Sequence, residues 1–267
     1  MTGITQSAPW WVRHDLAYRN LVVRQVRRVT PCMLRITLTG RELDGFSSPA
    51  FDDHVKVFFP ETGQARPTLP VAGPNGPVPP AHGTVSPCRS YTPRRFDPAA
   101  RELDIDMMLH GAGVADNWIR GATPGHILGI GGPRRSHAVP DVDWQLLMGD
   151  ETAIPAVSRR LTELPAHSRV HVVLEVADPT ERQPLPTAAN ADIVWRFRGG
   201  AEPGSTSALR QAVRDLGLPE WSRYFWGAGE SREMRAIRNH LTRDRNVDPA
   251  WVRVTGYWTR GVANHVE

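Results

Sequence analysis

Hydrophobic and polar residues alternate in several segments of the first half of the chain. This period of two is typical of strands that pack one face against a core. The segments are residues 34–39, 55–59, 103–110 and 126–133. A series of such strands is the pattern of an antiparallel barrel or sandwich.

Residues 60–87 separate two of these strands and are rich in proline and glycine. We expect neither a helix nor a strand ladder there, because proline lacks a backbone donor and glycine gives the chain too much freedom. Loops of this length are usually functional or mobile. The composition does not indicate which role this one has.

After about residue 140 the spacing of hydrophobic residues changes. Apolar runs typical of buried strands lie at 144–151, 169–178, 192–197 and 224–229. Helical spacing separates them, in residues 154–164, in residues 205–217 and in a helix that carries Met234, Ile237 and Leu241. This alternation predicts a parallel sheet covered by helices.

The length of the chain, 267 residues, exceeds the roughly 100 to 200 residues of a typical domain. We therefore expect two domains with separate cores. The change of pattern places the barrel domain at residues 18–138 and the α/β domain at residues 139–267.

The composition, 40% hydrophobic and 22% charged, is that of an ordinary globular protein. The formal net charge is +4, but no run of five or more basic residues forms a nucleic-acid-binding arm. No stretch approaches the roughly 18 apolar residues that span a bilayer, and the N-terminus lacks a basic region followed by a continuous apolar segment. We expect a cytoplasmic protein that binds a small anionic ligand, with neither nucleic acid nor membrane as a partner.

The chain contains two cysteines, Cys32 and Cys88. They are too few for a disulfide scaffold or for the four thiolates that hold a plant-type iron–sulfur cluster. Any redox chemistry therefore needs an organic or dissociable cofactor, and we assign no metal ligands.

The first candidate site is Arg89-Ser90-Tyr91-Thr92, within CRSYTPRR after the long loop. Arginine can neutralise a diphosphate, an aromatic ring can lie against a flavin, and a hydroxyl can donate a hydrogen bond to the flavin ring. The alternative is an edge strand that carries surface arginines.

A second candidate follows at residues 110–118, HGAGVADNW, where a strand ends, glycines turn the chain and a short amphipathic helix begins. Free backbone amides at a helix start can bind phosphate without a charged side chain. The segment could thus supply the second half of a diphosphate site, and the alternative is a plain strand-to-helix turn.

Seven motifs in this order resemble the FAD-binding siderophore-interacting protein family. They are RSYTPRR, LDIDMMLHG, GVADNW, GGPRRS, GDETAIPA, WGAGE and GYWTRG, and the resemblance runs from about residue 18 onward. It implies a ferredoxin-reductase-like flavoenzyme: an antiparallel β-barrel that binds FAD, followed by a parallel-sheet α/β domain that binds NADPH or NADH. The activity implied is the reduction of ferric siderophores.

By the same resemblance, residues of the two candidate segments would hold FAD. The expected FAD contacts are Arg89, Ser90, Tyr91, Thr92, His110, Gly111, Gly113, Ala115 and Trp118. Tyr91 and Thr92, expected at the isoalloxazine, are also the candidate catalytic residues. In the wider ferredoxin-reductase group a serine or threonine often stands where this chain has Ala115, so one phosphate hydrogen bond would be missing.

The nicotinamide site is expected at two turns of the second domain. Gly149, Asp150, Thr152 and Ala153 lie between a predicted strand and helix, where nucleotide phosphates approach a parallel sheet. The segment lacks the glycine-rich fingerprint, and Asp150 and Glu151 would repel phosphates unless they point away. Gly227, Ala228, Gly229 and Glu230 repeat the strand-to-helix turn, for which the alternative is a tight turn capped by Glu230.

The substrate site implied by the resemblance is an open, basic pocket over the flavin. The candidates are Lys56, Arg134, Arg135, Tyr257, Trp258 and Arg260, the last three on a C-terminal segment that returns to the flavin. Each cation alone could equally be a solvated surface residue. As a group they suit an anionic iron chelate.

Two other functions stay open: a flavin-loaded siderophore carrier that receives no hydride, and a general NAD(P)H:flavin or quinone reductase. A ferredoxin could also replace the nicotinamide as donor. Glu175 and Asp178 stand where an acid often contacts a ribose hydroxyl, whereas Arg182 could bind a 2′-phosphate, so these cues conflict. We expect a monomer, and the sequence does not identify the siderophore.

Overall fold

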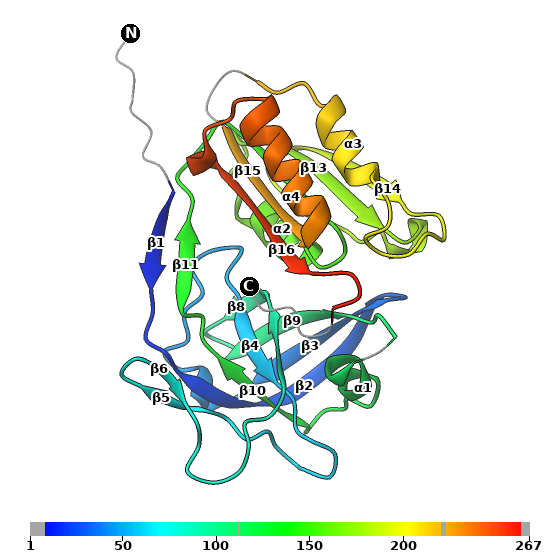
Figure 1. Ribbon diagram of the computed structural model, residues 1–267. Coiled ribbons are helices and arrows are strands. Elements are labelled where there is room, and N and C mark those ends of the chain that lie inside the picture. The colour runs from blue at the N-terminus through cyan, green and yellow to red at the C-terminus, as the bar shows by residue number, and fades with distance from the viewer. Residues whose placement is uncertain (1–8, 112, 220–222, 263–267) are drawn as a thin grey trace. The chain divides into compact units, whose positions relative to one another are not determined.

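The computed structural model describes residues 9–111, 113–219 and 223–262 (Figure 1). The chain forms two compact units. We call Trp11–Ala138 the barrel unit and the part that begins at Val139 the sheet unit. No helix in the described ranges is long and apolar enough to cross a membrane.

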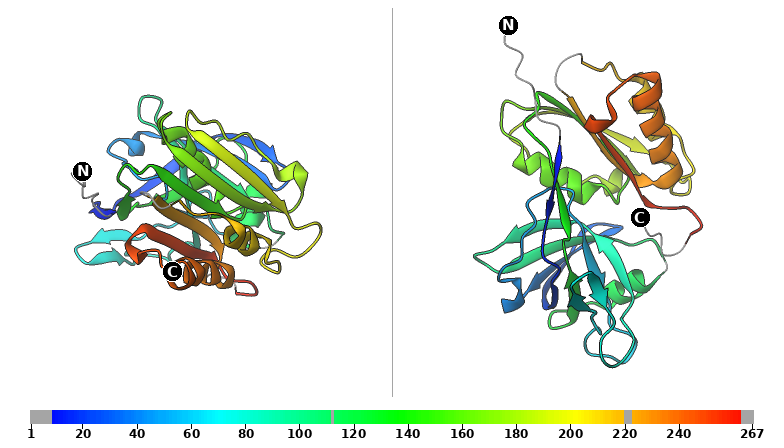
Figure 2. Two further views of the ribbon diagram at one scale, coloured as in Figure 1. Left: turned by 90° about the horizontal axis from the view of Figure 1, so that it is seen from above. Right: turned by 60° about the vertical axis from the view of Figure 1, so that its left-hand side comes forward.

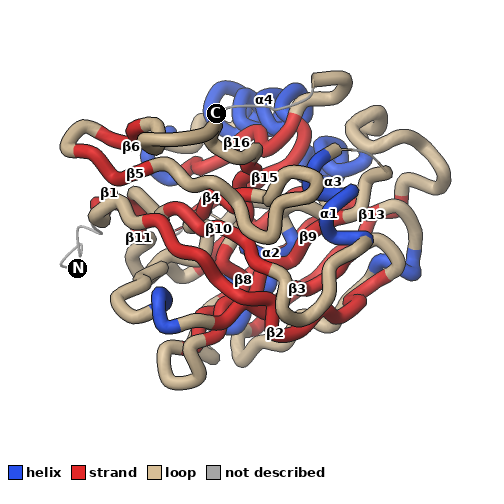
Figure 3. The backbone as a smooth tube through the Cα atoms, turned by 90° about the horizontal axis from the view of Figure 1, so that it is seen from below, coloured by secondary structure: helices blue, strands red, loops and turns tan. Residues whose placement is uncertain are grey.

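A seven-stranded antiparallel sheet with the order β7-β4-β10-β2-β3-β9-β8 forms the barrel unit. Its strands, drawn in red in Figure 3, are β2 (Tyr18–Thr30), β3 (Met33–Thr39), β4 (Val55–Phe58), β7 (Cys88–Tyr91), β8 (Pro93–Asp97), β9 (Glu102–Met108) and β10 (Ile127–Gly131). Only Thr92 separates β7 from β8, the two edge strands, so the sheet curls back on itself. This confirms the predicted antiparallel barrel.

The barrel core comes from the alternating positions that the sequence indicated and from β2, which had not been predicted. Leu103, Ile105 and Met107 on β9 are at most 1% exposed, and they pack with inward residues of β2, β3, β4 and β10. The helix α1 (Val114–Arg120) buries Ala115 and Ile119 against this core. A 3₁₀ turn, η1 (Arg41–Leu43), adds Leu43.

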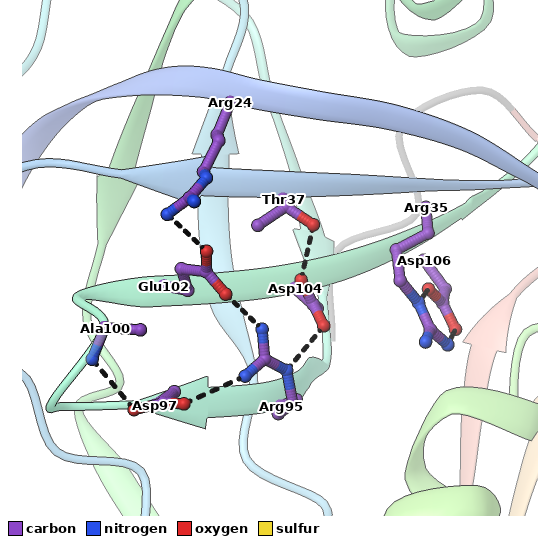
Figure 4. Close-up of polar contacts among 9 residues, drawn as sticks. All are labelled: Arg24, Arg35, Thr37, Arg95, Asp97, Ala100, Glu102, Asp104 and Asp106. Carbon is purple, nitrogen blue, oxygen red and sulfur yellow. Dashed lines mark hydrogen bonds and ion pairs between the residues drawn. The ribbon is translucent and has the colours of Figure 1, made fainter.

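The opposite face of β3, β9 and β8 carries a network of charged side chains (Figure 4). Asp104 accepts hydrogen bonds from Thr37 Oγ1 at 2.7 Å and from Arg95 Nε at 2.8 Å. Glu102 bridges Arg24 and Arg95, and Arg35 pairs with Asp106 through two bonds of 2.6 and 2.7 Å. Cross-strand pairs of opposite charge favour one strand register over the alternatives.

Residues 60–87 contain a short hairpin, so the expectation of no strand ladder was wrong. Strands β5 (Val71–Gly73) and β6 (Gly76–Val78) pair antiparallel around a two-residue turn. A two-stranded ribbon has free edges on both sides, so Pro77 can occupy it without removing a donor from a central ladder. A second small sheet pairs β1 (Trp10–Arg13) with β11 (Arg135–Ala138).

The sheet unit contains five parallel strands in the order β14-β13-β12-β15-β16. They are β12 (Trp144–Gly149), β13 (Arg169–Val176), β14 (Asn190–Phe197), β15 (Arg223–Glu230) and β16 (Val252–Trp258). The predicted parallel sheet is confirmed, although its fifth strand, β16, had not been predicted.

Three helices connect these strands: α2 (Ile154–Glu163), α3 (Ala208–Asp215) and α4 (Ser231–Asn239). The helices α3 and α4 lie together over one face of the sheet and α2 covers the other (Figures 1 and 2). Shorter turns are η2 (Pro179–Glu181), η3 (His240–Asp244, a π-helical extension of α4) and η4 (Pro249–Trp251). From β12 the chain continues to β13 on one side of the sheet, and from β15 it continues to β16 on the other side. The strand order therefore reverses between β12 and β15, and a ligand is expected at the C-terminal ends of these two strands.

Candidate functional site

The register of β7 divides the first candidate motif between two faces of the strand. Arg89 and Tyr91 lie opposite Val57 and Val55, which are both 0% exposed, whereas Ser90 lies opposite Lys56. Residues directly opposite one another in a ladder share a face. Arg89 and Tyr91 therefore lie together, and Ser90 accepts a 2.7 Å hydrogen bond from Lys56 Nζ on the other face.

Arg89 is a half-buried cation that forms no ion pair with any described residue. Its Nη1 donates to the carbonyl of the adjacent Cys88 at 2.7 Å. Burial raises the pKa of Tyr91, against the opposing charge of Arg89, so the phenol stays neutral. Arg89 thus keeps donors for an anion beside a neutral aromatic ring, which fits the diphosphate and ring system of a flavin.

Phe59 connects the two predicted halves of the flavin site. Its ring meets Tyr91 at 6.5 Å between centroids and Trp118 at 5.8 Å, both edge to face. Tyr91 and Trp118, 27 positions apart, therefore lie on either side of one buried ring. Sequence reasoning placed Phe59 only as a strand residue, because alternation cannot distinguish a core ring from one that orders a site.

The turn before α1 is partly closed by its own chain. Asp116 Oδ1 accepts from the amides of His110 at 2.8 Å and Gly111 at 3.1 Å, so neither amide is available to a phosphate. Burial works against ionisation of Asp116, but hydrogen bonds from Arg120 and these amides lower its pKa. Asp116 thus stays charged.

The start of α1 itself is open, since its N-cap residue, Gly113, has a positive φ of 103° and makes no side-chain cap. The phosphate-binding capacity expected of residues 110–118 is therefore confined to the first turn of α1, where Ala115 contributes no hydroxyl. Ala112 lies outside the described residues.

Two of the predicted substrate cations gather on the barrel around Gly131. Gly131 on β10 lies between Lys56 on β4 and Tyr18 on β2. Burial raises the pKa of Tyr18 and the charge of Arg134 opposes this, which places Arg134 near the phenol. Tyr18 also packs its ring against Phe58. Tyr18 was not predicted, and it begins β2, a strand that the sequence had not indicated.

Arg135 has a different setting. Its guanidinium lies over the ring of Trp11 at 5.1 Å, and Trp11 meets His137 at 4.9 Å. Trp10 and Trp11 are both about half exposed, at 50% and 51%. The Trp10–Trp11 pair at the start of the chain could have indicated an aromatic surface, since exposed tryptophans are unusual. The convergence of Lys56, Arg135 and Arg260 stays a prediction.

At the C-terminal end of β12, the carboxylates of Asp150 and Glu151 point into the protein. Asp150 accepts from Thr152 N and Oγ1, and from Trp258 Nε1 at 2.7 Å. Glu151 forms a bidentate pair with Arg198, at 2.6 and 2.9 Å, and both side chains are under 5% exposed. Both carboxylates are therefore engaged by donors of the protein itself.

Glycines in the two turns allow close packing. A Cβ on Gly149 would lie 2.2 Å from the carbonyl oxygen of Ala228 and 2.3 Å from Cβ of Ala153. A Cβ on Gly227 would meet Met148, and one on Gly229 would meet the Asp150 carboxylate at 2.8 Å. Packing alone therefore requires glycine at all three positions, and their contact with a nicotinamide stays a prediction.

Glu230 caps α4 and also holds the C-terminal segment. Its Oε2 accepts from the amides of Arg232 and Glu233 at 2.7 and 3.0 Å, and its Oε1 accepts from the amide of Arg260 at 3.4 Å. Ser231 Oγ donates to the carbonyl of Trp258. The capped turn, considered as an alternative from the sequence, is present, and it fixes the segment that carries Tyr257, Trp258 and Arg260.

A small cavity at this edge is lined by four carboxylates, those of Asp150, Glu175, Glu230 and Glu233. Burial raises the pKa of Asp150 from 3.8 to about 6, and the neighbouring Glu151 adds to the shift. A nucleotide diphosphate would be repelled here. Phosphates must bind outside this cavity if a nicotinamide cofactor uses this edge.

The chain matches two family descriptions that together cover most of its length. Residues 22–137 match the siderophore-interacting FAD-binding domain, and residues 142–261 match the siderophore-interacting protein. An NADPH-dependent ferric-chelate reductase of Escherichia coli is 34% identical over 263 residues, which cover 95% of this chain and 98% of the relative. The ferric vibriobactin reductase ViuB of Vibrio cholerae is 31% identical and covers 87% of this chain and 86% of its own.

Solved structures agree with these matches. A siderophore utilization protein from T. fusca has a TM-score of 0.90 at 38% identity, covering 97% of this chain and 98% of its own. The siderophore-interacting protein SipS from Aeromonas hydrophila has a TM-score of 0.75 at 30% identity, covering 92% and 93%. The cytochrome P450 reductase GcoB of Amycolatopsis, at 16% identity and a TM-score of 0.62, covers 91% of this chain and 71% of its own and shares the fold. The chain belongs to the siderophore-interacting protein family, with an N-terminal FAD-binding barrel and a C-terminal α/β domain.

Proposed function

We propose that this protein is an NADPH-dependent flavoenzyme that reduces ferric iron held in a siderophore. The observation that carries the proposal is Arg89, a half-buried cation without a carboxylate partner among the described residues, next to Tyr91 in a chain whose relatives include ferric-chelate and ferric vibriobactin reductases. A structural arginine in that position would normally be neutralised by a neighbouring acid.

The residues around Arg89 fit FAD. Arg89 and the first turn of α1 would neutralise the diphosphate, and Tyr91 and Trp118 would lie along the ring systems, ordered by Phe59. Bound there, FAD supplies the step between a two-electron hydride donor and a one-electron metal acceptor. Thr92, 6% exposed between β7 and β8, would donate a hydrogen bond to the isoalloxazine.

The substrate fits the cations that the structure leaves accessible. Lys56 and Arg135 are exposed, and Arg134 lies near Tyr18. A ferric siderophore with anionic oxygen donors would be attracted by this group, and the protein needs to supply no iron ligand. Iron(II) holds hard oxygen donors less tightly than iron(III), because its charge is lower, so reduction releases the metal. Each tenfold preference for the ferric form lowers the one-electron potential by about 59 mV.

The reaction takes place, in this proposal, in the cytoplasm, where nicotinamide reductants are kept reduced, and serves iron supply. The test is anaerobic stopped-flow spectroscopy of the purified yellow protein. NADPH should bleach the flavin, and a ferric siderophore added next should restore the flavin absorbance as a colorimetric chelator captures iron(II). Failure of NADPH to bleach the flavin would indicate a carrier or a ferredoxin-fed enzyme. Bleaching without reoxidation by any ferric siderophore, but with turnover of a quinone, would indicate a general reductase.

A further inference from the structure

Arginines at the C-terminal edge of the sheet unit differ in whether a described residue neutralises their charge: Arg182, Arg196 and Arg232 are exposed and form no ion pair with a described residue. Arg198 pairs with Glu151 and lies 4.0 Å from Glu175, and Arg210 pairs with Glu233 at 3.8 Å. The guanidinium of Arg182 lies over the Phe197 ring, 4.9 Å from the centroid.

A rigid turn positions Arg182. Asp178 caps the 3₁₀ turn η2 by accepting from Thr180 N at 2.7 Å and Thr180 Oγ1 at 2.6 Å, and these bonds lower the pKa of Asp178. Arg182 is the residue after this turn, and its amide donates to the Pro179 carbonyl. These bonds order the backbone of the turn η2, and the Phe197 ring gives the Arg182 guanidinium a contact.

The acids that compete for a ribose at this edge are engaged elsewhere. Glu175 is 6% exposed, accepts a 2.7 Å hydrogen bond from Thr206 Oγ1 and lines the carboxylate-rich cavity. Asp178 serves as the cap of η2. Burial removes Glu175 from the conflict seen in the sequence, and the cap occupies Oδ1 of the exposed Asp178, which favours the arginine.

Arg182 lies in the loop that follows β13, the second strand of the parallel sheet along the chain. Phe197 pairs in register with Val176, so the ring and the arginine mark the C-terminal ends of β14 and β13. In open sheets of this strand order, the loop after the second strand contacts the ribose of a bound dinucleotide, and an arginine there accommodates a 2′-phosphate. Building on the proposed function, we infer that Arg182, held over Phe197, binds the 2′-phosphate of NADPH and sets the preference for NADPH over NADH.

The chemistry of the pair suits a phosphate. A guanidinium that stacks on an aromatic ring keeps its N–H groups in the plane, pointing outward, and can donate two parallel bonds to phosphate oxygens. The stack also reduces the side-chain freedom that binding would otherwise remove. Arg196 and Arg232 at this edge are also exposed, and we choose Arg182 because it combines contact with an aromatic ring with a place in the loop after β13.

Equilibrium binding to the FAD-loaded protein tests the inference without turnover. Isothermal titration calorimetry would compare adenosine 2′,5′-bisphosphate with 5′-AMP for the wild type, Arg182→Ala, Phe197→Leu and Arg214→Ala. Arg214 is an exposed arginine in the last turn of α3 and serves as the matched control. Arg182→Ala should weaken binding of the bisphosphate by about tenfold to a hundredfold. Binding of 5′-AMP should change little, and Phe197→Leu should show a smaller loss of the same kind.

Kinetics of flavin reduction give the second measurement. Arg182→Ala should lower kcat/KM for NADPH by a similar factor and leave NADH nearly unchanged, while Arg214→Ala leaves both unchanged. If the wild type binds the bisphosphate no better than 5′-AMP, or if Arg182→Ala matches Arg214→Ala, the inference is wrong while the proposed reductase stands. If neither nicotinamide bleaches the wild-type flavin, the proposed function fails, and the calorimetry still reports whether Arg182 binds the phosphate.

Discussion

The edge of the barrel at β7 and the C-terminal edge of the parallel sheet differ in whether their charged groups have partners within the protein. At the barrel edge, Arg89 has no carboxylate partner among the described residues and the first turn of α1 has no side-chain cap. At the sheet edge, Glu230 caps α4, and Asp150 and Glu151 are bonded internally. We therefore expect the barrel edge to be able to bind an anion, whereas the sheet edge uses most of its polar groups for its own structure.

This difference shows that a helix start at a sheet edge is not in itself a phosphate site. Amides bind a ligand only if the protein's own acceptors leave them open. A dinucleotide can therefore contact the sheet unit through side chains at the rim, whereas FAD can be held by backbone and side chains together in the barrel unit. We call the barrel edge at β7 the open edge and the C-terminal edge of the parallel sheet the closed edge.

The largest effect is expected for the Glu151–Arg198 pair. Replacing Arg198 with Met leaves the Glu151 carboxylate buried at 4% exposure without its partner, which should lower the free energy of unfolding by about 3 to 5 kcal/mol. The double variant Glu151→Leu/Arg198→Met removes both charges and should recover much of this loss. Chemical denaturation measures both. As a control, Asp44→Ala breaks the exposed pair with Arg101 and should have little effect on stability. If Arg198→Met and Asp44→Ala lowered the free energy of unfolding equally, the Glu151–Arg198 pair would not be a buried ion pair of the closed edge.

Asp150 should give the sheet unit a distinctive pH dependence. Burial raises its pKa in the folded protein to about 6, against 3.8, so the folded state binds the proton more tightly than the unfolded state. Its contribution to stability is therefore most favourable at low pH and declines as the pH rises from about 4 to about 6. The decline amounts to at most about 3 kcal/mol for a shift of about two pKa units.

The variant Asp150→Asn isolates this dependence, because it cannot ionise. It should lose one hydrogen bond, which is an offset that does not vary with pH. The carboxylates of Glu151, Glu175, Glu230 and Glu233 face the same region in both proteins, so most of their titration cancels in the difference. Denaturation curves between pH 4 and 7 should show the wild type losing stability relative to Asp150→Asn as the pH rises. A constant difference would show that Asp150 is not desolvated.

The open edge is tested by Arg89→Ala. Loss of a charge-assisted bond to a phosphate should weaken FAD binding by roughly 1.5 to 3 kcal/mol, or about one to two decades in the dissociation constant. Fluorescence titration of the apoprotein with FAD measures this. Arg101→Ala is the matched control, since Arg101 lies on the same unit, is exposed and already pairs with Asp44. Identical FAD affinities in the two variants would remove Arg89 from the site.

Local patterns were sufficient to predict the type of both sheets, because period-two alternation and helical spacing depend on neighbouring residues. The long central strand β2 was not predicted. The strand β16 was not predicted, since VRVTGYW contains a glycine and polar residues that weaken the apolar signal. The hairpin β5–β6 was not predicted because proline and glycine counts do not distinguish an irregular loop from a ribbon with free edges. Strand existence could thus be derived from the sequence wherever packing made the pattern strong.

The direction of individual site side chains could not be derived in the same way. Asp150 and Glu151 are adjacent to a turn that could have held phosphate, and their actual partners lie far along the chain, 108 positions away at Trp258 and 47 at Arg198. Only the folded chain brings these partners near. The same holds for Phe59, whose contact with both Tyr91 and Trp118 depends on the pairing of β4 with β7 and on the packing of α1.

Thr92 alone separates β7 from β8, so the segment with the predicted flavin contacts is also the segment that closes the barrel. If FAD binds across this bend, it is a ligand of the sheet with both edge strands in place. A ligand that binds only the closed form adds RT ln(1 + [L]/Kd) to its stability, about 2.7 kcal/mol when free ligand is a hundredfold above Kd. The bend between β7 and β8 would then link cofactor supply to the stability of the barrel unit, and without FAD the free energy of unfolding should be lower by this amount.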